Sequence, residues 1–559
     1  MKVKLYCAVA FLLIASQLRA AQDEVKCYEQ QVVIPTYLIG PPDPNPQFYF
    51  GGQSQGAEHR IYPYPLYDNL TTQKADKTYT LVYLENQYIK VGILPEIGGK
   101  IFEAIDKTNG YNFIYRQHVI KPALISLLGA WISGGVEWDV PHHHRATSFL
   151  PVPYTTEQSA DGSKTIWVGE LELRDRMRWT VGVTLHPGKS LLEASFRMIN
   201  RTPLPTTMLC FSNVAVSVDD DYQVIFPPST QHVTYHKKVE FTTWPIATTF
   251  FSGADFTAGV DVSWYKNHYN SMSMFAWNYQ DDFFAGYDHG KHAGIMSVVD
   301  HNVVPGKKFF TWGNGPRGRM EDKLLTDNDG PYIELMVGAY SDNQPDYTWL
   351  EPYETRTWTQ NWYPFRDIDG VKFANTDAAV NLEVKDGAAT VGFYTTEAHP
   401  RATVSLKLKD QVLLSEETAI DPGKPYVKQI PLPAGVDEHD LRAAISDQGR
   451  ELAAYSPVKL VPEAMPQVVT PPPAPELIKN NEELYLAGMR IEQFHDSTHQ
   501  AEPYYLEVLK RDSGDIRANT ALAIDYIKMA RYADAEALLR KAIARATFNY
   551  TTPKDGEPF

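Results

Sequence analysis

The sequence predicts a mainly β protein in which a large antiparallel β-sandwich is followed by a small immunoglobulin-like β-sandwich and by α-helical repeats. Apolar and polar residues alternate in short segments up to about Trp362, for example over residues 79–84, 88–94 and 100–106, and turn residues separate these segments. A period of two is typical of strands that bury one face. From Glu476 onward the apolar period becomes helical.

Changes of composition predict the domain boundaries. Residues 21–75 are rich in Pro and Tyr and indicate an irregular arm, and residues 76–370 carry the strands of the large sandwich. Short alternating segments and the Asp386-Gly387 turn predict the small sandwich over residues 376–461. Residues 462–475 contain three consecutive prolines and indicate a semi-rigid linker. Residues 476–559 have small and apolar residues at a period of about 34, which predicts an incomplete stack of tetratricopeptide-like repeats.

The first 20 residues have the pattern of a secretory signal peptide. Lys2 and Lys4 precede an apolar run from Leu5 to Ser16, which is too short to span a bilayer, and Ala20 offers a small residue for cleavage. No later apolar run is long enough for a transmembrane helix. We therefore expect an exported protein, periplasmic or extracellular, without a transmembrane segment.

Charge and cysteine content narrow the function classes. The net charge of −16 argues against nucleic acid as a partner. A length of 559 residues is enough for about three or four domains. Cys7 lies in the signal peptide, so Cys27 and Cys210 remain, and whether they pair is open.

Several segments of the predicted large sandwich carry a family resemblance. The run Leu-Pro-Glu-Ile-Gly-Gly-Lys-Ile over residues 94–101, followed by Asp106, resembles the galactose-mutarotase-like β-supersandwich. Residues 193–202, 309–315, 330–338, 343–347 and 351–354 are similar to one bacterial family in particular, a domain of unknown function that occurs joined to tetratricopeptide repeats. The resemblance covers about residues 79–365, and it implies the supersandwich fold and a carbohydrate context but no catalytic residues.

The stretch from Gly134 to Tyr154 concentrates functional groups in a loop marked by glycine and proline. A carbohydrate-active site needs a proton donor, a proton acceptor and aromatic side chains that hold the sugar ring. We predict Glu137, Glu334 and His144 as catalytic residues, because a carboxyl group buried in a cleft becomes a general acid. The predicted substrate-binding residues are Trp138, His142, His143, Arg145, Trp312 and Glu351.

Other interpretations of this stretch stay open. His142 and His144 are two residues apart and would project to one side of an extended segment, as a metal pair would, but we predict neither a metal nor a cofactor. In the simplest alternative, this stretch is a surface loop exposed to solvent, and its histidines have no functional role. Glycoside hydrolysis is the favoured activity. The alternatives are a non-catalytic glycan-binding or scaffold protein, with helical repeats that recruit a protein partner, and a sugar epimerase.

Overall fold

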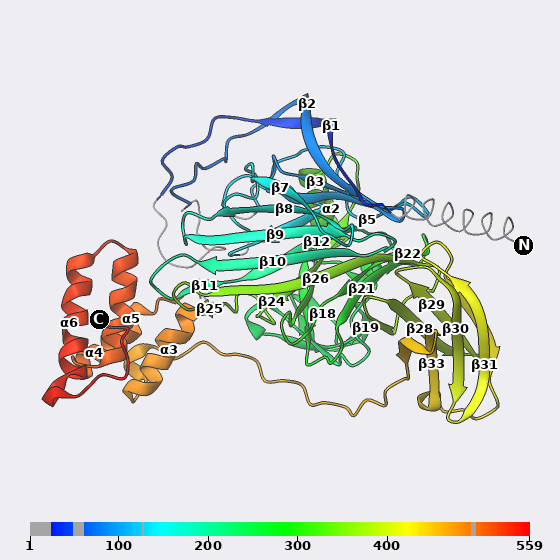
Figure 1. Cartoon of the computed structure of the whole chain (residues 1–559). Helices are drawn as coiled ribbons and strands as arrows, with labels where there is room; N and C mark the ends of the chain where they lie inside the picture. The colour runs from blue at the N-terminus through cyan, green and yellow to red at the C-terminus, as the bar shows by residue number, and fades with distance from the viewer. Residues whose placement is uncertain (1–23, 48–60, 126–127, 143, 494–498) are drawn as a thin grey trace, which may run out of the picture.

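The computed structural model describes residues 24–47, 61–125, 128–142, 144–493 and 499–559. These residues form a mainly β molecule with a helical C-terminal part (Figure 1). The predicted signal peptide, residues 1–20, lies outside the described residues. None of the described helices has the length and apolar character that a membrane span requires.

Two large antiparallel sheets form the first and largest unit. The strands of the 12-stranded sheet follow the order β1 (Lys26–Ile39), β2 (Leu70–Glu85), β3 (Ile89–Leu94), β4 (Lys100–Asp106), β6 (Val136–Asp139), β12 (Cys210–Ser217), β24 (Tyr332–Ala339), β23 (Gly306–Thr311), β20 (Met272–Trp277), β14 (His232–Thr234) and β15 (Phe241–Thr243). The twelfth strand, β5 (Tyr111–Ile114), pairs with β4 outside this order. The 8-stranded sheet has the order β13 (Tyr222–Ile225), β21 (Phe283–Asp288), β22 (Ala293–Val298), β26 (Thr355–Arg366), β10 (Leu192–Asn200), β9 (Met177–Leu185), β8 (Lys164–Leu171) and β7 (Tyr154–Gln158).

The main hydrophobic core lies between these sheets. Alternate residues of each strand point into it, because successive side chains of a strand face opposite ways. Trp138 of the 12-stranded sheet meets Phe196 and Trp362 of the 8-stranded sheet there, with ring centroids 5.6 and 6.4 Å apart. The other face of the 12-stranded sheet carries buried polar groups, which the next subsection describes.

The N-terminal arm differs from the prediction. Residues Lys26–Ile39 form a 14-residue strand at the edge of the 12-stranded sheet, where we expected irregular structure. Pro35 within it is compatible with an edge strand, because the amide groups along the free side of such a strand need no partner strand. Cys27 on this strand and buried Cys210 on β12 are both free thiols.

The small sandwich and the helices follow in the predicted order. One four-stranded sheet joins β27 (Phe373–Ala374), β28 (Ala378–Lys385), β29 (Ala388–Thr395) and β32 (Tyr426–Pro431), and the other joins β31 (Gln411–Ile420), β30 (His399–Leu408), β33 (Leu441–Asp447) and β34 (Arg450–Tyr455). The C-terminal helices are α3 (Asn481–Gln493), α4 (Glu502–Arg511), α5 (Ile516–Lys528) and α6 (Tyr532–Ala546), and neighbours along the chain pack together. Figure 1 shows the long connection that leads from the small sandwich to these helices.

That connection lies along the large sandwich. The backbone N–H of Val469 donates a 2.9 Å hydrogen bond to the carbonyl of Lys238, and the side chain of Gln231 donates one of the same length to the carbonyl of Val461. Near the helices, the hydroxyl of Tyr504 donates to the carbonyl of Pro473 at 3.0 Å. The predicted linker is therefore anchored at its ends and at one point within.

Candidate functional site

The register of the 12-stranded sheet brings the two predicted catalytic carboxylates to one face. Glu137 of β6 lies opposite Asn213 of β12, and Ala215 of β12 lies opposite Glu334 of β24. Paired residues share a face, and so do residues two apart on a strand. Glu137 and Glu334 are thus on the same face, two strands across and two residues along, which places their backbones roughly 12 Å apart with Asn213 between them. This face points away from the core.

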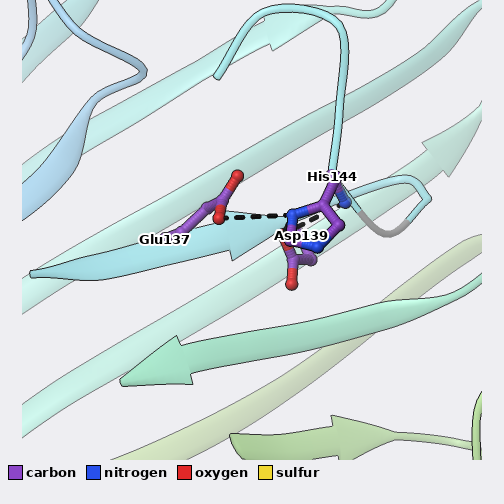
Figure 2. A group of neighbouring side chains, drawn as sticks. All are labelled: Glu137, Asp139 and His144. Atoms are coloured by element: carbon purple, nitrogen blue, oxygen red, sulfur yellow. Dashed lines mark hydrogen bonds and ion pairs between the residues drawn. The ribbon is translucent and has the colours of Figure 1, made fainter. Parts of the chain in front are cut away.

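Glu137, Asp139 and His144 form the centre of the candidate site. The His144 Nδ1 atom lies 3.6 Å from Glu137 Oε2 and 3.8 Å from Asp139 Oδ1, and the His144 backbone N–H donates to Asp139 Oδ1 at 3.2 Å (Figure 2). His144 has a φ of 51°, which turns the loop back over the strand. Its side chain is 16% exposed and that of Glu137 is 6% exposed, so His144 is the more accessible of the two.

The electrostatics of this centre favour a protonated imidazole. Burial alone would lower the pKa of His144, but the carboxylates of Asp139, Glu137 and Glu334 outweigh burial and raise that pKa to about 9. For Asp139, burial raises the pKa even though His144 acts against it. At neutral pH His144 therefore holds a proton and a positive charge between carboxylates.

Two buried lysines flank the carboxylates on neighbouring strands. Lys100 of β4 donates from Nζ to the carbonyl of Ile132 at 3.0 Å, and Lys308 of β23 donates from Nζ to Gln344 Oε1 at 2.7 Å. Burial lowers the pKa of Lys100 to about 8 although nearby carboxylates, Glu137 first, oppose the change. Burial also lowers the pKa of Lys308, against the pull of Glu334 and Asp139. Both lysine side chains lie on the same sheet face as the carboxylates, and their positive charges partly balance the negative charges of Glu137, Asp139 and Glu334.

Glu334 is buried on β24, beside Glu137, His144 and Lys308. Burial raises its pKa, and this effect exceeds the opposing influence of His144, Lys308 and a hydrogen bond with Asn213. The hydroxyl of Tyr332 donates to Glu334 Oε1 at 3.5 Å, and Trp312 Nε1 donates to that hydroxyl at 3.0 Å. Glu334 is therefore the group best suited to hold a proton near neutral pH and release it.

Trp131 is a site residue that our sequence analysis missed. Its Nε1 donates to Glu137 Oε2 at 2.7 Å, and its ring meets the ring of His144 edge-on at 6.0 Å between centroids. The other carboxylate oxygen of Glu137, Oε1, is buried and has no hydrogen-bond partner among the residues that the structure describes. Trp131 thus orients Glu137 and leaves one oxygen for another group.

The structure places two predicted binding residues, Trp138 and Arg145, away from this centre. Trp138 is buried in the core, and its Nε1 donates to the carbonyl of Gly99 at 2.9 Å. It cannot stack on a sugar, because neighbours on a strand face opposite ways and Glu137 and Asp139 occupy the other face. Arg145 is also buried: it donates to the carbonyl of Trp138 at 3.0 Å and lies over the ring of Trp179. These contacts fix the loop, and they correct the prediction of substrate binding.

His142 and Glu351 also differ from the prediction, and His143 lies outside the described residues. His142 is fully buried; its Nδ1 lies 3.1 Å from Asp175 Oδ2 and its Nε2 lies 3.3 Å from Thr207 Oγ1. Glu351 is exposed in the turn after β25 (Thr348–Leu350), where its backbone N–H bonds Glu354. Neither side chain has a described contact with the catalytic centre. Trp312 reaches Glu334 through Tyr332, as given above.

Glu137, Asp139 and His144 each offer one ligand atom within 4.8 Å of the others, a set that could hold a divalent cation. Lys100 and Lys308 place positive charge beside the carboxylates and oppose such binding. The donor set therefore fits a group of ion pairs at least as well as a metal.

A loop joins this site to the helices. Gln344, which accepts the hydrogen bond from Lys308, precedes Asp346, whose carboxylate lies 2.8 Å from Lys238 Nζ. The backbone N–H of Tyr347 donates to the carbonyl of Gln493 in α3 at 3.3 Å. Residues 341–350 therefore contact both a site lysine and the first C-terminal helix.

Comparison with known families supports the predicted resemblance. Residues 57–365, more than half of the 559, match the model described as domain of unknown function DUF5107. The chain belongs to this family. The DUF5107 region contains every residue of the candidate site, and residues 373–455, which form the small sandwich, match the model described as the second domain of YphG-like proteins. The prediction of a family of unknown function is confirmed.

Solved structures share parts of this architecture. A TPR-domain containing protein from Parabacteroides distasonis has 17% sequence identity and a TM-score of 0.54, over 95% of this chain and 81% of that protein. It shows the same fold. A putative mutarotase from Salmonella typhimurium has 8% identity and a TM-score of 0.38, over 52% of this chain and 91% of that protein. A galactose mutarotase-like protein from Clostridium acetobutylicum has 11% identity and a TM-score of 0.36, over 52% of this chain and 96% of that protein.

Proposed function

We propose that this DUF5107 protein is a carbohydrate-active enzyme, and that the activity its site favours is glycoside hydrolysis. The observation that carries the proposal is the pair Glu137 and Glu334, which lie on one sheet face but in different surroundings. Trp131 donates a hydrogen bond to Glu137 and His144 lies beside it, whereas burial raises the pKa of Glu334 and favours its protonated form. Two carboxyl groups in different surroundings, one of them able to donate a proton, are what glycoside hydrolysis requires.

The roles follow from these surroundings. Glu334 donates its proton to the glycosidic oxygen as the bond from that oxygen to the anomeric carbon breaks. Glu137, through its uncommitted Oε1, faces the electron-poor anomeric carbon or removes a proton from the water that attacks it. When Glu137 bonds to the anomeric carbon, water displaces it in a second step, one water proton returns to Glu334, and the other stays on the product hydroxyl. When Glu137 acts as the base, it takes one water proton, the other stays on the product hydroxyl, and proton exchange with solvent returns both carboxyl groups to their starting states. His144 lies 3.6 Å from Glu137 and places a positive charge beside it.

A second candidate activity is sugar epimerisation, which the position of His144 favours. An acid and a base that flank a pyranose open and close the ring by moving protons, without activation of a water molecule. His144 carries a proton and faces carboxylates from two strands, so a histidine–carboxylate pair is present as well as a carboxylate pair.

One set of assays separates the possibilities. The protein is incubated with a panel of oligosaccharides while reducing ends are measured, and with free aldoses while anomer exchange is followed by NMR. We expect new reducing ends and no acceleration of anomer exchange. Faster exchange without cleavage would establish the epimerase instead. If neither reaction occurs but sugars raise the melting temperature, the protein is a binding module.

We also propose export and a recruiting role for the helices. The pattern of residues 1–20 supports an exported, periplasmic or extracellular protein. The helix pairs α3–α4 and α5–α6 support the tetratricopeptide assignment, and Leu486 and Leu506 on them are more than 40% exposed. Exposed apolar side chains on helical repeats fit a protein partner.

A further inference from the structure

The outer face of the 8-stranded sheet has a groove that lies apart from the candidate site. It has a volume of about 600 Å³ and crosses β8, β9, β10 and β26. Figure 1 shows these strands with no other element lying over them. The groove spans three interstrand steps, about 14 Å. Phe196 and Trp358, which belong to the core, form its floor, and the lining side chains that point away from the core are Trp167, Thr180, Ser195, Arg197, Thr357 and Thr359.

Trp167 gives this groove an aromatic wall. It lies opposite Gly182, and a Cβ atom on Gly182 would come within 2.6 Å of the Trp167 ring. The indole therefore lies across the neighbouring strand, and only glycine leaves room for it. Its Nε1 donates to Glu157 Oε2 at 2.7 Å, which fixes the ring in this position. A fixed, half-buried indole is a surface on which the apolar face of a sugar ring can stack.

Polar side chains line the rest of the groove, and of these Ser195 donates from its hydroxyl to Glu193 Oε1 at 3.1 Å. In the part of the chain that the structure describes, the side-chain hydroxyls of Thr180, Thr357 and Thr359 make no hydrogen bond. Arg197, opposite Thr180 and Thr357, is exposed and makes no ion pair with a described residue. The same holds for Arg178, two residues before Thr180 on the same face.

The two arginines decide the class of ligand. On this face, Glu193 and Glu157 are engaged by His186 and Trp167 and are not paired with the arginines. Two guanidinium groups that form no ion pair with the residues that the structure describes, on a protein of net charge −16, mark a local preference for anions. Guanidinium groups bind carboxylate and sulfate well.

We propose that this groove binds an anionic polysaccharide chain, with a sugar ring on Trp167, hydroxyls on the threonines and a carboxylate or sulfate on Arg197. A neutral glycan would leave the arginines unused, and an acidic peptide would leave the flat indole and the row of hydroxyls without a matching group. Such a second site would hold the polymer while the candidate site acts on it. The groove itself needs no catalysis, so its test is independent of the proposed hydrolysis.

The test is direct binding by titration calorimetry at low salt with the full chain carrying Glu334→Gln, which prevents turnover. The probes are galacturonate oligomers, their methyl esters, sulfated galactan oligomers and inorganic sulfate. We expect binding of at least one anionic oligomer, roughly tenfold weaker with Trp167→Ala. Arg197→Gln should remove the preference for the acid over its ester. Binding should also weaken as salt is added.

Matched controls keep the result interpretable. Phe250→Ala removes another exposed aromatic ring, and Arg401→Gln removes an exposed arginine that pairs with Glu417 on the small sandwich. Both should bind as the parent does, and circular dichroism should show all variants folded. The proposal is wrong if no anionic oligomer binds, if Trp167→Ala binds normally, or if inorganic sulfate alone accounts for the signal. None of these outcomes bears on whether Glu334 catalyses hydrolysis.

Discussion

At the scale of single residues, Glu334 is the most informative position. Glu334→Gln keeps the shape of the side chain but removes the transferable proton, so turnover should fall by roughly a hundredfold or more. Activity of the wild type should also fall as pH rises through the raised pKa of this carboxyl group. Steady-state rates on a cleaved oligosaccharide measure both effects. The exposed Glu351, changed in the same way, should retain normal rates, and normal rates for Glu334→Gln would remove it from the mechanism.

His144 gives a second prediction, on stability. Its pKa in the folded protein is about 9, against 6.5 for an unperturbed histidine, so the folded state binds the proton more tightly. The stabilisation is complete below about pH 6.5 and disappears as pH rises through about 9. Asparagine tolerates a positive φ, so His144→Asn removes the charge without straining the backbone. We expect this variant to lower the free energy of unfolding by an amount on the order of 3 kcal/mol at pH 6 and by little at pH 10.

Urea unfolding at both pH values measures this difference. His292→Asn is a suitable control, because His292 has the same φ of 51° but a side chain that is 61% exposed. A loss for His144→Asn that is equal at pH 6 and pH 10 would mean that packing, and not the charge on the imidazole, stabilises this loop.

At the scale of elements, the short strand β6 positions the whole site. Gly135, just before the strand, has a φ of 68°, and a Cβ atom there would lie 2.1 Å from the carbonyl oxygen of Ile101 on β4. Gly135→Ala should therefore destabilise the protein by about 2–4 kcal/mol and reduce activity, since Glu137 follows two residues later.

Gly110→Ala is the control that distinguishes backbone strain from a steric clash of the added methyl group. Gly110 has a φ of 77°, but its Cβ position has no atom within 4 Å, so only backbone strain of about 1 kcal/mol remains. Thermal or chemical unfolding of both variants provides the comparison. Equal losses would show that β4 moves to accept the methyl group and that β6 is not fixed by this contact.

The strands also explain how far the sequence could predict the site. Alternation within residues 136–139 was visible in the sequence, and it already assigns Trp138 to the face opposite Glu137. The contributions of Lys100 and Lys308 were not visible, because they depend on the strand order β4-β6-β12-β24-β23, which joins segments up to about 200 residues apart. No local pattern encodes that order. Glu334 was predicted because a carboxyl group in an apolar strand stands out locally.

At the scale of the whole molecule, the connection between the β domains and the helices should be the first point of cleavage. Residues 462–475 are largely exposed, and few hydrogen bonds hold them to the large sandwich. Segments with so few contacts open at low cost in free energy. Limited proteolysis followed by mass spectrometry should show a first cut in this range, with both sandwiches intact. Early digestion of a sandwich, with this connection uncut, would contradict the prediction.

The loop over residues 341–350 has a consequence for regulation. Gln344 accepts the hydrogen bond from Lys308, and three residues later Tyr347 bonds the last residue of α3. A molecule that displaces α3 would break the hydrogen bond from Tyr347, and if the loop shifted in response, the free energy of ligand binding beside Lys308 would change. Coupling of this kind is reciprocal: a sugar in the site would change the affinity of the helices for their partner by the same factor. Such a protein would report the presence of sugar through its helices even in a variant that no longer turns it over.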